Sequence, residues 1–100
     1  MKWFRSKYVF DDTDAIYCTD DNGTPEAVLT VNLSEYGFTP PKDCVVVQTH
    51  KISDELYELF KKELVETEIR KIPYGYCEGM LVKLKSNWKT LCKKVGNKNE

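Results

Sequence analysis

The sequence predicts an α+β domain in which an antiparallel sheet of about five to six strands carries two helices packed on one face. Three observations lead to this prediction. Short segments rich in β-branched and aromatic residues recur between turn residues, which is typical of antiparallel strands. Two segments in the second half instead place apolar residues at helical spacing. The length of 100 residues suits a single domain, which we assign to residues 1–96, followed by a polar C-terminal tail at 97–100.

The first two strands are predicted near the N-terminus. Residues 2–10 mix aromatic with basic side chains, and aromatic side chains fit the pleated surface of a strand. Three of them are candidates for the inward face: Trp3, Tyr8 and Phe10. Residues 15–19 form a second short strand, which leads into an acidic turn.

The sequence Asp-Asp-Asn-Gly at 20–23 is the clearest turn in the chain. Asn-Gly tolerates the positive φ angles of a type I′ turn, whose twist matches that of paired strands. The apolar residues of 26–33 follow this turn as a strand. Residues 14–33 are therefore predicted to form a β-hairpin.

The middle of the chain is predicted to form a loop, a buried strand and a helix. Two consecutive prolines in residues 34–42 remove two amide donors, so this segment is a loop. Three successive valines within residues 44–48 indicate a strand that is buried on both faces. Ser53 is placed to cap a helix whose apolar residues share one face, namely Leu56, Leu59, Phe60, Leu64 and Val65.

The last third is predicted to form two more strands and a final helix. Residues 68–72 form a strand that ends at Pro73, and residues 79–85 form the next strand after a glycine-containing turn. Ser86 is placed to cap the final helix, and Gly96 ends it. The apolar stripe of this helix consists of Trp88, Leu91, Cys92 and Val95.

Charge is distributed unevenly, although the net charge is only −1. Residues 1–50 hold 4 basic and 8 acidic side chains, a net charge of −4, whereas residues 51–100 hold 11 and 8, a net charge of +3. The near-zero total argues against a chain that binds polyanions, or imitates them, over its whole surface. The acidic and basic segments are nevertheless separate candidates for binding surfaces.

Two groups of residues are candidates for binding a partner protein. Five aspartates lie close together near the start, namely Asp11, Asp12, Asp14, Asp20 and Asp21. They form either a docking surface for a basic partner or a solvated hairpin tip that keeps the protein soluble. Tyr74 and Tyr76 lie in a predicted turn, and Tyr36 and Phe38 lie in another. Exposed aromatic residues beside glycine anchor protein interfaces, and the alternative is that these four cap the open ends of the sheet.

Three lysines near the other end recur at every fourth residue: Lys85, Lys89 and Lys93. On the predicted final helix they form one basic face that would contact nucleic-acid phosphates. The alternatives are a solvated face and a contact with an acidic protein. Trp88 lies nearby but belongs to the apolar stripe, which favours docking of this helix on the sheet.

The sequence has no motif for phosphate, dinucleotide or catalytic zinc binding, and we predict a protein that is not an enzyme and holds no metal or cofactor. His50 is the only histidine, and its place just before a helix favours a loop residue over a catalytic base. The acidic turn fails the pattern of a calcium-binding loop, because Leu29 stands where a glutamate ligand is needed. The cysteines are too dispersed for a typical zinc site and are predicted to be free, buried thiols: Cys18, Cys44, Cys77 and Cys92.

No stretch approaches the roughly 18 consecutive apolar residues of a membrane span. The first residues are basic, but Asp11 and Asp12 follow them instead of the apolar segment of a signal peptide. We therefore expect a cytoplasmic protein that has no membrane partner.

Between Ala27 and Lys85 the order of features resembles a family of small bacterial proteins of unknown function that are carried on phages, plasmids and conjugative elements. The residues that carry the resemblance are AVLTVNL at 27–33, the proline-containing loop, the valine-rich strand, the amphipathic helix and IPYGYC at 72–77. No activity is attached to that family. The resemblance implies a context, because small mobile-element proteins often bind and block host machinery, including restriction and CRISPR nucleases.

Two functions from different classes follow as expectations. The first is a non-enzymatic binding protein of a bacterial mobile element that inhibits a host defence nuclease, of the anti-CRISPR or anti-restriction type, through its acidic surface. Its partner would be a nucleic-acid-binding host protein whose basic surface the aspartates contact in place of DNA. The second is a small nucleic-acid-binding regulator that uses the C-terminal lysines.

Overall fold

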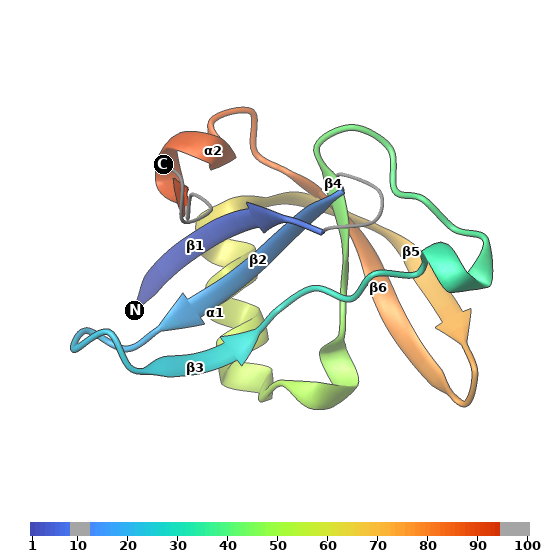
Figure 1. Ribbon diagram of the computed structural model, residues 1–100, viewed down its shortest axis with the longest axis horizontal. Helices are drawn as coiled ribbons and strands as arrows, with labels where there is room; N and C mark the ends of the chain where they lie inside the picture. Colours follow the sequence, from blue (N-terminus) through green and yellow to red (C-terminus); the bar gives the residue numbers. More distant parts are fainter. Residues whose placement is uncertain (9–12, 95–100) are drawn as a thin grey trace.

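The computed structural model describes residues 1–8 and 13–94 (Figure 1). The described part is α+β and consists mostly of strands, with two α-helices. The strands are β1 (Lys2–Lys7), β2 (Asp14–Thr19), β3 (Pro25–Val28), β4 (Cys44–Val47), β5 (Val65–Tyr74), β6 (Cys77–Leu84) and β7 (Lys93–Lys94). The helices are α1 (Asp54–Leu64) and the single turn α2 (Trp88–Leu91), and two 3₁₀ helices are η1 (Ser34–Tyr36) and η2 (Thr49–Lys51). No helix within the two described ranges is long and apolar enough to cross a membrane.

The prediction of a single sheet of five to six strands is wrong. The strands form one sheet of four, in the order β3-β2-β1-β7, and a second sheet of three, in the order β4-β6-β5. The division occurs within residues 26–33, which were predicted to form one strand. β3 pairs with β2 as far as Val28, and Thr30 then bridges to Val47 of β4.

Leu29 joins the two sheets at this point. Its N–H donates to the carbonyl of Ile16 in the four-stranded sheet, and its carbonyl accepts from the N–H of Gln48 just after β4, both at 2.9 Å. Val31 then donates to the carbonyl of Val46 at 3.0 Å. One extended segment therefore contributes to both sheets, and its partner in the second sheet lies far along the chain.

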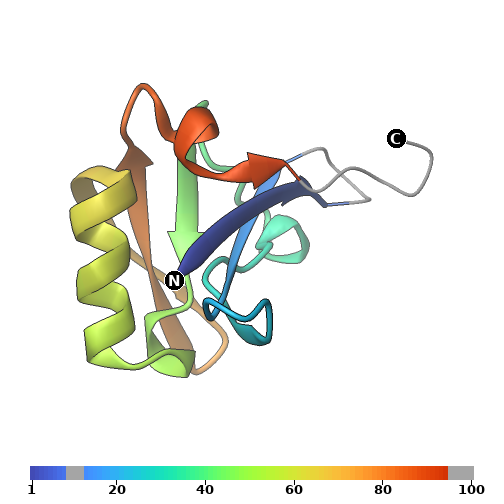
Figure 2. The same cartoon turned by 90° about the vertical axis from the view of Figure 1, so that its left-hand side faces the viewer.

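The principal core lies between the two sheets and α1. Trp3, Ile16 and Cys18 project into it from β1 and β2, and Phe60 and Leu64 project into it from α1. The rings of Trp3 and Phe60 lie 5.6 Å apart, which joins the four-stranded sheet to the helix. Figure 2 shows α1 on one side of this core and β1 on the other, with β4 and β6 between them in that view.

Helix α1 begins as predicted. Ser53 caps it, because the Ser53 hydroxyl accepts the N–H of Leu56 at 3.1 Å. The helix ends at Leu64, and Val65 is already the first residue of β5. Val65 was predicted to lie on the apolar face of the helix, and it is instead buried at the start of a strand.

Strand β4 is buried on both faces, as predicted. Val45 and Val47 belong to the principal core, whereas Val46 belongs to a second apolar cluster on the other face of the three-stranded sheet. Leu33 and Phe38 cover that second face from the connection between β3 and β4. Gly79 of β6 lies close to Val46 of β4 on this face. A Cβ atom on Gly79 would lie only 2.6 Å from Val46 Cγ1, so a larger residue does not fit there.

The turn at 20–23 is not the predicted type I′ turn. Gly23 has a φ of 87°, but Asn22 does not have the positive φ that a type I′ turn requires. Instead, Asp20 Oδ1 accepts the N–H groups of Asn22 and Thr24, each at 2.9 Å. The carboxylate therefore stabilises a turn in which only the final glycine is left-handed, as is common in three-residue hairpin loops.

Strand β5 continues through Pro73 to Tyr74, although it was predicted to end before the proline. β5 pairs only with β6, so it is one of the two edge strands of its sheet. An edge strand tolerates proline because an N–H on its open side has no strand partner.

The prediction for the final helix is also wrong, because the helix is much shorter than expected. α2 is one turn that begins after Asn87, and Ser86 does not cap it. Lys93 and Lys94 then pair in parallel with Phe4 and Arg5 of β1. An isolated helix of one turn has little stability of its own. Backbone pairing with the open edge of β1 therefore determines the conformation of Lys93 and Lys94. Several residues named in the predictions lie outside the described residues: Phe10, Asp11, Asp12, Val95, Gly96 and the tail at 97–100.

Candidate partner-binding surface

The hairpin between β5 and β6 presents an aromatic side chain at its tip. Tyr74 and Cys77 are paired, so the loop consists of Gly75 and Tyr76 alone. Gly75 has a φ of 58° at the first loop position, whereas Tyr76 does not have a positive φ. This is the pattern of a type II′ turn, in which glycine is preferred at the first position. The short loop holds Tyr76 fully exposed to solvent, at 109% relative exposure.

Tyr36 reaches the same place from a different part of the chain. It ends η1, whose position is fixed by Leu33, because Leu33 is buried in the second cluster and its carbonyl accepts the N–H of Tyr36 at 2.9 Å. The rings of Tyr36 and Tyr74 then meet edge to face, with centroids 5.7 Å apart. Tyr36 remains 58% exposed.

Tyr74 is held from a second side by His50 of η2. The two ring centroids lie 5.8 Å apart, and the Tyr74 hydroxyl lies 3.5 Å from the ring nitrogens of His50. Tyr74 is half-buried against the second cluster, and this burial raises its pKa. We define the aromatic surface as Tyr36 and Tyr74, whose rings are in contact, together with Tyr76 at the tip of the same hairpin.

The sequence predicted part of this surface. Tyr74 and Tyr76 were named as partner-binding residues, and Tyr36 and Phe38 were placed in a separate turn, with no prediction that this turn lies beside Tyr74. Phe38 is half-buried beneath the surface in the second cluster, and the guanidinium of Arg70 lies 5.8 Å from the centroid of its ring. The contribution of His50 was missed, because no local signal links it to the hairpin.

The described aspartates do not gather in one place. Asp14 and Asp20 lie at opposite ends of β2, roughly 20 Å apart at about 3.3 Å per residue. Asp14 pairs with Lys7 at 3.1 Å, and Asp20 stabilises its own turn. Asp21 accepts a hydrogen bond from the ammonium group of Met1 at 2.6 Å, which holds the pKa of Asp21 below its usual value.

The three predicted lysines do not form one helical face. Lys85 precedes α2, and its ammonium group donates to the carbonyl of Lys62 in the last turn of α1 at 2.9 Å. Lys89 lies on α2, and its ammonium group lies 5.8 Å from the centroid of the Trp88 ring. Lys93 lies on β7. The predicted spacing fails because the helix that would align these residues is only one turn long.

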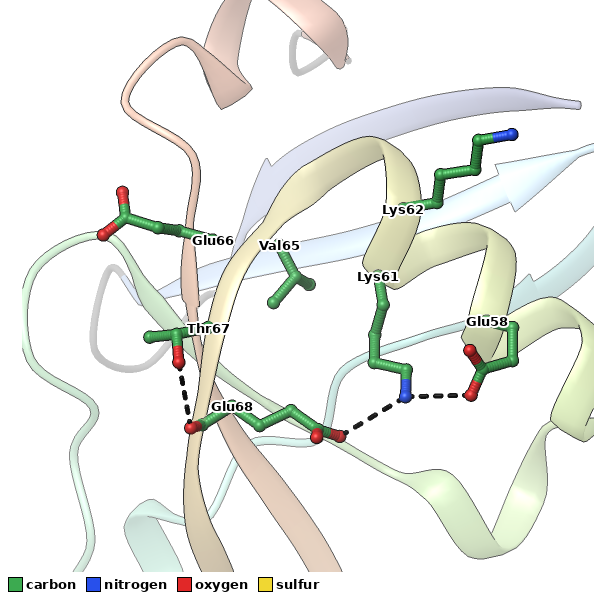
Figure 3. Close-up of a pocket in the computed structure, with 7 residues that line it drawn as sticks. All are labelled: Glu58, Lys61, Lys62, Val65, Glu66, Thr67 and Glu68. Atoms are coloured by element: carbon green, nitrogen blue, oxygen red, sulfur yellow. Dashed lines mark hydrogen bonds and ion pairs between the residues drawn. The ribbon is translucent and has the colours of Figure 1, made fainter.

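A shallow hollow of about 400 Å³ lies between α1 and β5, and the sequence did not predict it. Figure 3 shows the seven residues that line it. The Lys61 ammonium lies between the carboxylates of Glu58, at 2.8 Å, and Glu68, at 3.7 Å. The hydroxyl of Tyr57 also donates to Glu68. These charged groups satisfy one another, so the arrangement fixes α1 against β5. The one local signal for this arrangement in the sequence is the three-residue spacing of Glu58 and Lys61, which suits an ion pair on one helix.

The cysteines are free thiols, as predicted. Three are buried, namely Cys18, Cys44 and Cys92, and Cys77 is half-buried beside the aromatic surface. Burial raises the pKa of Cys92 from its ordinary value of 9.0 to about 11. Because its folded-state pKa is the higher one, this thiol contributes stability below pH 9 that is lost as the pH rises toward 11. Within residues 1–8 and 13–94, no group of three or more potential ligands is placed to hold a metal ion.

We expect these thiols to differ in reactivity. An excess of a maleimide at neutral pH should modify Cys77 alone in the native protein and all four cysteines after denaturation, because burial blocks the other three. Mass spectrometry of the intact protein counts the labels. The Cys77→Ser variant should take up none while folded, and rapid labelling of this variant would contradict the burial of the remaining thiols.

No protein-family model matches the chain, and neither the curated proteins nor the solved structures contain a significant match.

Proposed function

We propose that this protein is a non-enzymatic binding protein that attaches to a partner protein through the aromatic surface. The observation that carries the proposal is the position of Tyr76, fully exposed at the tip of a two-residue loop. Because the Tyr76 ring is fully exposed, it gains no burial energy in the isolated chain. It becomes favourable when a partner buries it.

The surroundings of Tyr76 support this role. Tyrosine is enriched among the residues that dominate binding energy at interfaces, and a rigid ring loses little conformational entropy on binding. Tyr36 and Tyr74 already touch each other and are held by packed elements, so they present a preformed surface. The sequence offered both the aspartates and the tyrosines as partner-binding residues. We assign the role to the tyrosines, because Asp14, Asp20 and Asp21 already have partners within the chain.

The partner class that we propose is a host defence nuclease, which the resemblance to mobile-element proteins implies. The binding protein would occupy a surface of the nuclease that its nucleic-acid substrate needs. The nucleic-acid-binding alternative loses the arrangement on which it was based, because Lys85 is engaged with α1 and Lys93 lies on a strand.

The test measures binding and inhibition with purified restriction and RNA-guided nucleases. We expect the native protein to bind one of them and to slow cleavage. Tyr36→Ala combined with Tyr76→Ala should weaken binding at least about tenfold, since truncated anchor residues commonly cost more than about 1–2 kcal/mol. Ile69→Ala is the matched control, because it removes a side chain of 46% exposure from the same hairpin outside the aromatic surface.

Each outcome of this test separates one part of the proposal. Undiminished binding by the double tyrosine variant would contradict the aromatic surface. Loss of binding only when the five aspartates are changed to asparagine would return the role to the acidic residues. Failure to bind any nuclease would contradict the partner class, and binding of DNA alone at low salt would favour the regulator.

A further inference from the structure

The loop between β2 and β3 carries an asparagine followed by a glycine, Asn22 and Gly23, at its tip. Residues 21–24 are all exposed to solvent. Beyond its two chain neighbours, no atom would lie within 4 Å of a Cβ placed on Gly23. In Figure 1 this loop projects from one end of the four-stranded sheet, and the hairpin between β5 and β6 lies at the opposite side of the picture. Water therefore reaches both residues, and the space around Gly23 is open.

The side chain of Asn22 is not engaged. Its backbone N–H donates to Asp20 Oδ1 at 2.9 Å, whereas its carboxamide forms no hydrogen bond within residues 1–8 and 13–94. Gly23 has no side chain that would shield its own backbone nitrogen, and glycine moves more freely than any other residue. The carboxamide carbon of Asn22 and the nitrogen of Gly23 are therefore two groups that can react with each other.

Asn22 differs in this respect from the other asparagines within the described ranges, Asn32 and Asn87. Asn32 Oδ1 accepts the backbone N–H two residues further on at 2.8 Å, and the residue that follows Asn32 is Leu33, only 2% exposed. Asn87 precedes Trp88, which is 1% exposed. A large buried side chain holds the backbone nitrogen of its residue in place and hinders its approach to the preceding carboxamide.

We propose that Asn22 is a site of spontaneous deamidation. The backbone nitrogen of Gly23 attacks Cγ of Asn22 and loses its proton to solvent. The side-chain nitrogen leaves as ammonia, and a cyclic succinimide remains. Water then opens the ring at either of its carbonyl carbons, which gives an aspartyl residue or an isoaspartyl residue whose main chain runs through the former side chain. The overall reaction consumes one water molecule, releases one ammonia molecule and involves no oxidation or reduction.

The hydrogen bonds of the turn restrain this reaction. The attacking nitrogen of Gly23 donates its hydrogen to the carbonyl of Asp20 at 3.1 Å. Asp20 Oδ1 also holds the N–H groups of Asn22 and Thr24. Gly23 must leave this arrangement before its nitrogen can reach Cγ of Asn22. The rate therefore depends on how often the turn opens, and local opening of this kind costs least in exposed loops.

The product differs from the native loop in charge and in length. A carboxylate at position 22 joins those of Asp20 and Asp21, and like charges so close together repel one another. The isoaspartyl form also lengthens the backbone of the loop by one carbon atom, which changes the geometry of the hydrogen bonds to Asp20. We therefore expect the reaction to loosen the turn between β2 and β3.

Incubation of the native protein at mildly alkaline pH, followed by fragmentation mass spectrometry of its peptides, tests the proposal. Position 22 should gain the mass difference between an NH₂ and an OH group, while Asn32 and Asn87 keep their amides. The same incubation in urea is the positive control, because unfolding removes the restraint of the turn. An Asn22 that stays intact in the native protein long after it has reacted in urea would overturn the proposal, and so would equal conversion of Asn22 and Asn32.

Two variants test the restraint by the turn. Asp20→Ala should raise the rate about fivefold or more, the factor that corresponds to the loss of one ordinary hydrogen bond. Asp21→Ala is the matched control and should leave the rate unchanged, because this neighbouring carboxylate bonds to Met1 rather than to the turn. Circular dichroism shows that both variants are folded. Equal rates for Asp20→Ala and the native protein would overturn the restraint. No partner protein takes part, so the result is independent of nuclease binding.

Discussion

Trp88→Ala should lower the free energy of unfolding by about 3–5 kcal/mol. Trp88 is 1% exposed and is the largest fully buried side chain among the described residues. It lies in the principal core, where it anchors a helix of one turn that has no side-chain cap at its start. So short a helix has little stability of its own, and the buried ring holds it in place.

Urea denaturation followed by circular dichroism measures this loss. Leu91→Ala is the control within the same helical turn, because Leu91 is 43% exposed and its truncation should cost less than about 1 kcal/mol. Equal losses for the two variants would show that burial of Trp88 does not stabilise this end of the molecule.

Asp43→Ala should cost about 2–4 kcal/mol, for two reasons. Asp43 Oδ1 accepts the indole N–H of Trp88 at 3.1 Å, and alanine would leave that partly buried donor without its partner. Asp43 also has a φ of 62°, a left-handed conformation that alanine adopts only at a cost of about 1–2 kcal/mol. Its carbonyl accepts the N–H of Leu84 at 2.8 Å, so the backbone is not free to relax.

Two further substitutions separate these causes in the same denaturation experiment. Asp43→Asn keeps an acceptor oxygen and tolerates the left-handed conformation, so it should cost less than about 1 kcal/mol. Asp43→Gly removes the backbone strain but not the loss of the hydrogen bond, so it should fall between the two. If alanine and asparagine were equally destabilising, the hydrogen bond to Trp88 would not be the cause.

The elements that the sequence predicted well are those that local chemistry determines. Ser53 caps α1 through a backbone N–H three residues away. The valines of β4 predict burial on both faces, whatever their strand partners are. The two-residue loop at Gly75 likewise follows from the left-handed conformation that glycine provides.

The features that the sequence did not predict depend on partners far along the chain. The strand expected at 26–33 divides between two sheets because Thr30 meets Val47, a pairing that no local pattern encodes. The apolar stripe that includes Trp88 and Cys92 fits a helix, but Lys93 pairs with Phe4 near the start of the chain. Pairing with the edge of β1 replaces the predicted helix at Lys93 and Lys94.

The same reasoning applies to the candidate sites. Tyr74 and Tyr76 were predicted from a local turn, and the exposure of Tyr76 follows from it, whereas Tyr74 ends β5 and is half-buried. The distances that relate Tyr36 and His50 to Tyr74 arise from the packing of two connections, so the sequence did not reveal them. For the same reason the sequence suggested an acidic cluster, although Asp14 and Asp21 each pair with a group near the start of the chain.

The double role of Leu29 has a consequence for unfolding. Its N–H is bonded to one sheet and its carbonyl is bonded next to a strand of the other, so neither sheet can open at this point without straining the other. Leu29 therefore links the two sheets. To separate them, its hydrogen bonds to Ile16 and to Gln48 must both break. We therefore expect the two sheets to unfold together rather than one after the other.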